Sequence, residues 1–512
     1  MALPQLNAAL LASGHKFAAG VKVSPVRALP ERVLQFGEGN FLRGFVDWMI
    51  NAMNDKGLFN GKVVLVQPIP QGLSPQINAQ NGLYTLILRG IQGGQKVEDI
   101  SIISAVSRCL NPYGEYSTYM ACADQPELRF IVSNTTEAGI KFSADDKLTD
   151  APPASYPGKL TQFLYRRYQT FKGDVSKGLI MLPCELIERN GDNLQRTVKE
   201  TAQHWQLPAE FSAWLDAACV FCNTLVDRIV TGYPKAQMAE LTARFGYEDQ
   251  ILDTAEIFHF WVIEASKDIK HELPLVEAGL DVVWTTDMSP YRERKVRILN
   301  GAHTMTVLGA YLAGQNIVRG CMQDEVIHKY MQNGIFQEII PTLNLPKDDL
   351  TTFAKAVSER FANPYIDHAL LDISLNSVSK YKARILGTVK DYYKLNKHYP
   401  ARLTFALAAL IAFYRGSEIR NNALIGTRNG QEYMIRDDMP VLEAFQQAWA
   451  GCTGDCKCTP EFCSELVNKI LARKDFWGEN LVETLPGFAG QVAAQLHAIR
   501  NLGVLAAMAK VA

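Results

Sequence analysis

The feature that most constrains the fold is an alternation of short apolar segments with helix-compatible segments in the first half of the chain. Buried strands are predicted by apolar runs at 32–36, 62–67, 100–106, 128–133 and 178–183. Helix-compatible patterns at 41–53 and 160–168 lie between these runs. Strands that alternate with helices are typical of a parallel, doubly wound sheet. We therefore expect an α/β domain over residues 1–285.

The character of the chain changes after about residue 285. The segments that follow have helical periodicity and few runs of β-branched residues; they lie at 295–313, 325–341, 350–361, 366–390 and 402–415. No internal repeat and no low-complexity linker interrupts them. The sequence therefore predicts a second, mostly α-helical domain over residues 286–512.

The composition is that of a soluble globular protein, with 47% hydrophobic and 21% charged residues. A net charge of −1 argues against a nucleic-acid or anionic-membrane partner. The longest apolar run, 403–414, is too short to span a bilayer and predicts a buried helix. No basic residue precedes the apolar stretch at 6–12, as a secretory signal would require. We expect a cytoplasmic protein with reduced thiols.

Four cysteines lie close together near the C-terminus, at Cys452, Cys456, Cys458 and Cys463. Their spacing, C-x3-C-x-C-x4-C, is not that of a standard zinc site, and no histidine lies nearby. The nine histidines of the chain are dispersed. We therefore expect no metal.

A glycine-containing turn follows the first strand of the α/β half. Gly37 and Gly39 precede an apolar helix-compatible run, as in dinucleotide-binding turns, where backbone N–H groups approach a pyrophosphate. The third glycine of G-x-G-x-x-G would fall on Leu42, and here it comes at Gly44. The turn favours a Rossmann-like nucleotide site, and a glycine-rich turn without a ligand stays open at this point.

The end of the second strand carries Gln67 where an acidic residue commonly binds the adenosine ribose. No lysine or arginine lies between Gln67 and Gln80 to pair with a 2′-phosphate. The segment favours NAD over NADP.

A basic segment opens the helical half and contains Lys295, Asn300 and His303. At about 100° per residue, Asn300 and His303 share a helix face, and Lys295 lies about 80° from His303. A lysine moved into an apolar cleft can lose proton affinity and act as a general base, and an asparagine amide can donate to an alkoxide. The spacing alone also fits a solvated basic helix face.

The pattern K-x4-N-x2-H at these three residues resembles the signature of the long-chain polyol dehydrogenase family that includes mannitol 2-dehydrogenase. Other landmarks of that family follow in order along the chain: the glycine turn and the segments 133–139, 223–228, 256–264, 363–364 and 379–380. The resemblance implies that Lys295 is the acid/base, that Asn300 polarises the substrate oxygen, and that His303 orients the substrate. It also implies catalysis without a metal.

The same resemblance implies which residues bind the two ligands. For the cofactor they are Phe36, Gly37, Glu38, Gly39, Asn40, Phe41, Arg43, Gln67, Asn134, Thr135, Thr136 and Glu137. For the substrate they are Asn190, Asp227, Arg228, Lys380, Arg384 and Arg402.

The chain departs from the mannitol-oxidising members in two places. Arg292 stands where they carry a glutamate, so a proton-gating role for that glutamate is not carried over. Their C-D-N motif reads Cys184-Glu185-Leu186 here, which leaves Asn190 as only a candidate for the second oxyanion donor.

Within the family, five segments are most similar to members that act on hexuronates: 35–43, 183–188, 190–191, 225–234 and 401–416. The implied reaction converts D-altronate and NAD to D-tagaturonate and NADH. An enzyme for the epimer fructuronate and a non-catalytic NAD-binding sensor stay open. A bound carboxylate needs a cationic partner. Neutral-sugar members also carry the lysine at Lys380, so Arg384 and Arg402 are the better candidates.

Overall fold

The computed structural model describes residues 3–136, 138–451 and 458–512. The chain forms two compact units, Met1–Met288 and Ser289–Ala512.

Unit 1 is built on a six-stranded parallel sheet in the order β6-β3-β2-β7-β8-β9. The strands are β2 (Glu31–Phe36), β3 (Lys62–Val66), β6 (Val106–Leu110), β7 (Phe130–Ser133), β8 (Ile180–Pro183) and β9 (Val220–Phe221). In its register Leu34 lies opposite Val64 on one side and Ile131 on the other. All five residues of β3 are buried, as expected for a sheet covered on both faces.

Alternate residues of the strands pack into two separate cores. Val33 and Leu65 pack with α3 (Trp48–Asp55), whereas Leu34 and Val64 pack with α6 (Tyr156–Thr170) and α7 (Asn190–His204). The doubly wound α/β fold predicted for the first half is therefore confirmed.

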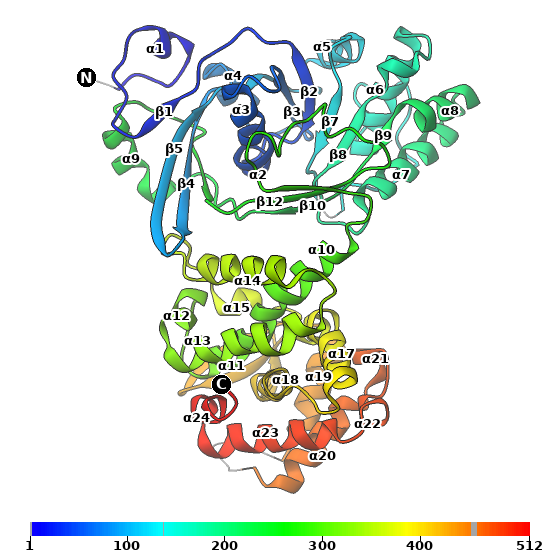
Figure 1. Ribbon diagram of the computed structural model, residues 1–512. Helices are drawn as coiled ribbons and strands as arrows, with labels where there is room; N and C mark the ends of the chain where they lie inside the picture. Colours follow the sequence, from blue (N-terminus) through cyan, green and yellow to red (C-terminus); the bar gives the residue numbers. More distant parts are fainter. Residues whose placement is uncertain (1–2, 137, 452–457) are drawn as a thin grey trace. The chain divides into compact units, whose positions relative to one another are not determined.

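The strand expected at 100–106 is in fact two strands of different sheets. β5 (Gln95–Ile103) ends there, and β6 begins after Ser104 and Ala105. β5 pairs antiparallel with β4 (Tyr84–Gln92) in a long ribbon that Figure 1 shows, within a four-stranded sheet completed by β1 (Val21–Val23) and β11 (Asp253–Glu256). The apolar character continues through the break, so the sequence pattern could not locate it.

A third sheet of unit 1 contains β10 (Asn223–Asp227), β12 (Phe260–Glu264) and β13 (Val282–Thr285). Its first pair is antiparallel and its second pair is parallel.

Unit 2 is mostly helical, as predicted. The apolar run at 403–414 forms α18 (Ala401–Phe413), which is buried from Leu403 to Phe413. It packs against α11 (Gly301–Leu312) and α23 (Phe488–Leu502) (Figure 1). Other helices include α10 (Ser289–Arg294), α13 (Glu325–Asn333), α14 (Lys347–Phe361), α16 (Ser377–Tyr381) and α17 (Gly387–Asn396).

Unit 2 also contains an antiparallel sheet that the sequence pattern did not predict: β14 (Gly416–Arg420), β15 (Ala423–Arg428) and β16 (Gln431–Ile435). Its strands are short, and the outer two are largely exposed, so they lack the apolar runs by which buried strands are recognised. No helix in the described part of the chain has both the length and the apolarity needed to cross a membrane.

Candidate active site

The glycine turn lies at the carboxyl end of β2, between β3 and β7, where the strand order of the parallel sheet reverses. Ligands of doubly wound sheets bind at this switch point. Gly37 has a φ of +122°, and a Cβ there would lie 3.3 Å from Leu42 Cδ1. Gly39 is exposed, and a Cβ there would meet nothing within 4 Å. The turn therefore has a backbone conformation at Gly37 that favours glycine, and it leaves open space beside Gly39.

A continuous helix begins directly after this turn, with Gly39 as its N-cap and no side chain capping it. It runs through α2 (Asn40–Leu42), a π-helical turn (Arg43–Asp47) and α3. Exposed Asn40 and half-buried Phe41 lie at its start. Uncapped N–H groups beside open space fit the pyrophosphate of a dinucleotide.

Two residues predicted to bind the cofactor lie beneath the turn. Arg43 is 1% exposed, and its guanidinium donates to Glu38 O (3.1 Å) and Asn40 Oδ1 (2.8 Å) and also bonds to Ile251 O. Phe36 is fully buried against Tyr156, with ring centroids 4.9 Å apart. This placement favours a supporting role for Arg43 and Phe36.

Gln67 and Glu38 hold the loop that follows β3. Gln67 Nε2 donates to the carbonyls of Ile69 and Pro70, each at 2.9 Å, and Glu38 Oε1 accepts from Leu73 N at 3.4 Å. A Cβ at Gly72 would lie 2.2 Å from Glu38 Oε1, so a larger residue there would displace the Glu38 side chain. Burial raises the pKa of Glu38.

The loop after β7 lies beside the turn, since Asn134 N donates to Phe36 O at 3.2 Å. Its shape depends on Glu185, which accepts from Thr135 N (2.9 Å), Thr135 Oγ1 (3.1 Å) and Ser133 Oγ (3.1 Å). Sequence reasoning missed Glu185, although the departure at Cys184-Glu185-Leu186 was a signal. Thr136 is exposed, and Glu137 lies outside the described residues.

Asn190, the candidate oxyanion donor, is buried and fully hydrogen-bonded. Its amide nitrogen donates to the carbonyls of Pro183 (2.9 Å), Glu185 (3.1 Å) and Thr224 (3.1 Å). Its amide oxygen accepts from Gly191 N (2.9 Å) and Thr224 N (2.8 Å). No donor of this amide remains for a substrate, so the arrangement favours a structural role.

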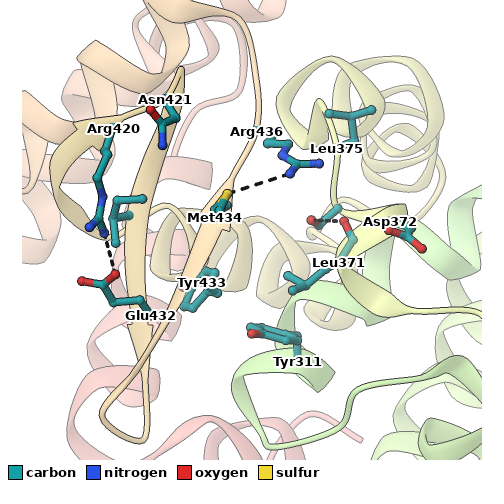
Figure 2. Close-up of a pocket in the computed structure, with 12 residues that line it drawn as sticks. Tyr311, Leu371, Asp372, Leu375, Arg420, Asn421, Glu432, Tyr433, Met434 and Arg436 are labelled. Atoms are coloured by element: carbon teal, nitrogen blue, oxygen red, sulfur yellow. Dashed lines mark hydrogen bonds and ion pairs between the residues drawn. The ribbon is translucent and has the colours of Figure 1, made fainter.

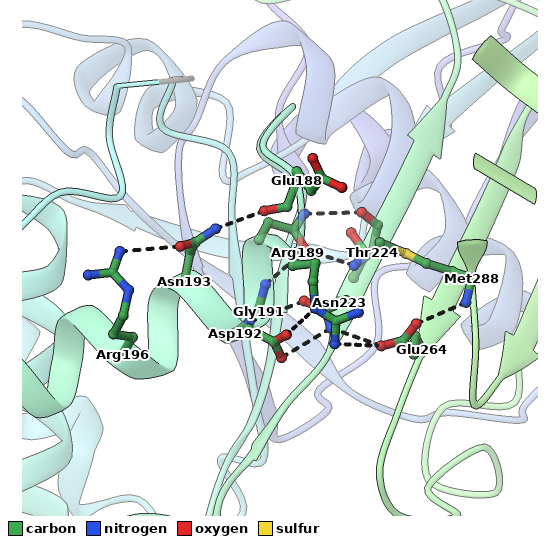
Figure 3. A network of polar contacts seen from close by, with 11 residues as sticks. Glu188, Arg189, Gly191, Asp192, Asn193, Arg196, Asn223, Thr224, Glu264 and Met288 are labelled. Atoms are coloured by element: carbon green, nitrogen blue, oxygen red, sulfur yellow. Dashed lines mark hydrogen bonds and ion pairs between the residues drawn. The ribbon is translucent and has the colours of Figure 1, made fainter. Parts of the chain in front are cut away.

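Next to Asn190 a polar network joins three elements of unit 1 (Figure 3). Asn223 Nδ2 donates to Asp192 Oδ1 (3.1 Å) and Glu264 Oε1 (2.9 Å), and Glu264 Oε2 accepts from Met288 N (2.9 Å). Arg189, in the left-handed region with φ 48°, also bonds to Asp192. The network ties the last residue of unit 1 to β12.

Arg228, predicted to bind substrate, is 6% exposed and donates to backbone carbonyls, including Glu256 O (3.0 Å) and Gly44 O (2.8 Å). Its guanidinium lies 4.1 Å from the ring centre of Trp48, and burial lowers its pKa to about 9. Its neighbour Asp227 is 5% exposed. These contacts favour a structural role for Arg228.

Lys295 and Asn300 are joined by a π-helical segment (Lys295–Asn300) between α10 and α11. Because i→i+5 bonds close such a turn, Lys295 and Asn300 lie about one turn apart on the same side, whereas α-helical spacing would separate them by about 140°. Both side chains are partly exposed. Single π-turns inside helices are frequent at functional sites.

His303 lies one turn further along, on α11. Its ring centroid is 4.2 Å from that of Phe361 and 5.5 Å from that of His368. Its Nδ1 is buried and has no hydrogen-bond partner among the described residues. Burial, with smaller contributions from nearby cationic groups, lowers the pKa of His303 to about 3, so the ring is neutral at physiological pH.

Two of the predicted substrate-side cations lie near this histidine, and their charges add to the lowering of its pKa. Lys380 Nζ donates to Ile373 O at 2.8 Å, and Arg384 Nη1 donates to Thr304 Oγ1 at 3.3 Å. Arg402 differs, because its Nη1 lies 3.1 Å from Glu338 Oε1 in a buried ion pair. Arg360 and His368 also act on His303, and no motif in the sequence pointed to either.

A pocket of about 870 Å³ lies elsewhere in unit 2, between α11, α15 (Leu370–Ile373) and the antiparallel sheet (Figure 2). Tyr311, Asp372, Tyr433 and Arg436 are among its lining residues, and none of the predicted site residues lines it. We therefore do not assign the reaction to this pocket.

Within the described parts of the chain, no group of three or more histidine, cysteine or acidic residues could hold a metal ion. Cys452 and Cys456 lie outside these parts, and Cys458 and Cys463 are buried. Burial raises the pKa of Cys463 to about 12.

Comparison with known proteins supplies the family. Residues 31–277 match the mannitol dehydrogenase Rossmann domain, and residues 287–500 match the mannitol dehydrogenase C-terminal domain. Altronate oxidoreductases of Escherichia coli O6:K15:H31 and Shigella flexneri are each 47% identical over 481 residues, which is 94% of this chain and 96% of theirs.

Two solved structures share the fold. A substrate-free D-sorbitol dehydrogenase has a TM-score of 0.80 at 20% identity and covers 98% of this chain and 100% of its own. Pseudomonas fluorescens mannitol 2-dehydrogenase, in complex with NAD and D-mannitol, has a TM-score of 0.68 at 21% identity and covers 98% of both chains. Since both family domains match in order and together span most of its length, the chain belongs to the mannitol dehydrogenase family.

Proposed function

We propose that the protein is an NAD-dependent oxidoreductase that interconverts D-altronate and D-tagaturonate with Lys295 as acid/base and without a metal. The observation that carries most weight is the π-turn that brings Lys295 and Asn300 to one side of a helix, with neutral His303 one turn on. The substrate is proposed from the relatives named altronate oxidoreductase, which match over 94% of the chain. Membership of a dehydrogenase family supports oxidation at a CH–OH group.

Unit 1 offers the residues that would hold the cofactor. The exposed backbone at Gly39 and Asn40 would receive the pyrophosphate, and Glu38 and Gln67 shape the adjoining loop. NAD, when bound, supplies the hydride acceptor. The segment from Gln67 to Gln80 has no cation for a 2′-phosphate, which supports NAD over NADP.

In unit 2, each residue of the K-x4-N-x2-H set has a distinct task. Lys295 takes the hydroxyl proton as the alcohol is oxidised and returns it when the ketone is reduced. The Asn300 amide donates to the same oxygen and stabilises its negative charge. His303 is neutral, so one ring nitrogen donates and the other accepts; it can therefore orient a substrate hydroxyl without adding charge.

The test is NADH oxidation by the purified protein with tagaturonate, fructuronate and the neutral ketose tagatose, each repeated with NADPH. We expect the highest kcat/KM with tagaturonate and NADH. Preference for fructuronate would assign the epimeric substrate instead. Binding of NADH without turnover of any substrate would identify a non-catalytic sensor, and a higher kcat/KM with NADPH would overturn the cofactor assignment.

A further inference from the structure

Unit 2 holds an arginine that lacks an acidic partner. Arg384 is half-buried, its one side-chain hydrogen bond is the long contact to Thr304, and no ion pair of the described residues includes it. A second cation lies near it, since Arg384 and Lys380 both act on His303, and burial, followed by the charge of Arg384, lowers the pKa of Lys380. An acidic residue that acts on Lys380, Asp437, is bonded to the Tyr414 hydroxyl and the Val378 amide.

Other arginines of unit 2 form ion pairs with acidic residues. Arg402 pairs with Glu338 at 3.1 Å, Arg297 pairs with Asp391 at 2.9 Å, and Arg319 pairs with Asp367 at 2.6 Å. A half-buried guanidinium beside other cations is costly unless an anion joins it. Arginine also offers the fork that binds a carboxylate through two parallel hydrogen bonds.

The position of Arg384 relative to the proposed catalytic residues fits such an anion. It lies on the π-helical segment Lys382–Leu386, which contacts the segment Lys295–Asn300. A Cβ on Gly301 would lie 3.6 Å from Arg384 O, and the guanidinium reaches Thr304, the residue after His303. The guanidinium of Arg384 therefore lies near His303, on the C-terminal side of that residue along the helix, and Lys295 lies on the N-terminal side.

We infer that Arg384 binds the substrate carboxylate and is the residue that selects uronates over neutral ketoses. The inference rests on the proposed function. In tagaturonate the carboxylate lies at the opposite end of the carbon chain from the carbonyl. A substrate with its carbonyl at Lys295 and Asn300 would extend past His303 and place its carboxylate at Arg384. Arg402, the other candidate, already has Glu338 as its partner.

The experiment compares kcat/KM for tagaturonate and tagatose in the wild-type protein and in Arg384→Ala, Arg384→Gln and Arg384→Lys. We expect Arg384→Ala to lower kcat/KM for tagaturonate by about 10- to 150-fold, mainly through KM, the loss expected for one charge-assisted bond. The kcat/KM for tagatose should change far less, so that the preference for tagaturonate over tagatose becomes smaller. Arg384→Lys, which retains the charge but not the fork, should lose less.

The control is Lys382→Ala, an exposed cation of the same π-helical segment, which should leave the preference unchanged. Arg384→Gln can retain a hydrogen bond to Thr304 and serves if the alanine variant does not fold. If a folded Arg384 variant keeps the wild-type ratio of kcat/KM for tagaturonate to kcat/KM for tagatose, the inference about Arg384 fails but the proposed function does not. A wild-type protein that reduces tagatose as well as tagaturonate would overturn the proposed function.

Discussion

Replacing Arg402 with methionine should destabilise unit 2 by about 3 kcal/mol and leave substrate choice unchanged. Glu338 is 2% exposed and accepts from Arg402 Nη1 (3.1 Å), Arg402 N (3.0 Å) and Leu403 N (3.0 Å). Removing one partner of a buried pair costs about 3–5 kcal/mol, because the other charge stays buried. Two backbone donors remain on Glu338, which places the cost at the lower end of that range.

The assay is equilibrium urea unfolding followed by circular dichroism, together with steady-state kinetics. Adding Glu338→Gln to Arg402→Met should recover only part of the loss: an amide needs no counter-charge, but it can accept from only one of the two backbone N–H groups. The cycle of four proteins gives the coupling energy. Lys469→Met, which breaks the exposed pair with Glu465, is the control and should cost no more than about 1 kcal/mol. The reasoning fails if Arg402→Met unfolds like the wild type while its KM for tagaturonate rises.

Three further predictions concern catalysis and pH. Lys295→Ala should lose about 10²–10⁴-fold in turnover, whereas Lys329→Ala, at an exposed lysine of α13, should not; near-normal turnover of a folded Lys295 variant would exclude it as acid/base. Activity should survive exhaustive chelation, and a loss that zinc restores would contradict metal independence. Burial, with a smaller contribution from Asp253, raises the pKa of Asp47 to about 7. The folded protein therefore favours the protonated carboxyl, and the contribution of Asp47 to the free energy of unfolding is complete below about pH 4 and is lost as the pH rises through 7. Asp47→Asn should therefore stabilise the protein more at pH 8 than at pH 5, by the order of 2 kcal/mol in urea unfolding, and an equal effect at both pH values would refute this.

The sequence predicted the strands and helices that have strong periodicity, because burial of one face or both leaves a pattern in neighbouring residues. It predicted α18 and the central strands well. It could not separate β5 from β6, whose apolar character is continuous across the break, and it missed β14–β16, a sheet of short strands whose outer two are largely exposed.

At the site, the sequence indicated residue types and spacing but not partners. The sequence does not distinguish an arginine that pairs with an acidic residue of the protein from an arginine that binds a ligand. Arg402 and Arg384 differ only because Glu338, far from both along the chain, lies beside one of them. Asn190 was similarly indistinguishable from a ligand-binding amide until its five internal hydrogen bonds were seen. The face that Lys295 shares with Asn300 was also hidden, because the periodicity assumed an α-helix.

The π-turn in the helix from Ser289 to Leu312 accommodates one residue more between Lys295 and Asn300 than an α-helix could place between two side chains on the same face. Deleting any one of the four would let the segment close as ordinary α-helix with its hydrogen bonds intact. Lys295 and Asn300 would then stand four residues apart in an α-helix, and side chains at that spacing share a face. Such a protein should fold and keep its acid/base on the side of Asn300. Closing the full-length segment as α-helix would instead separate the two side chains by about 140°, so the π-turn is what accommodates the extra residue.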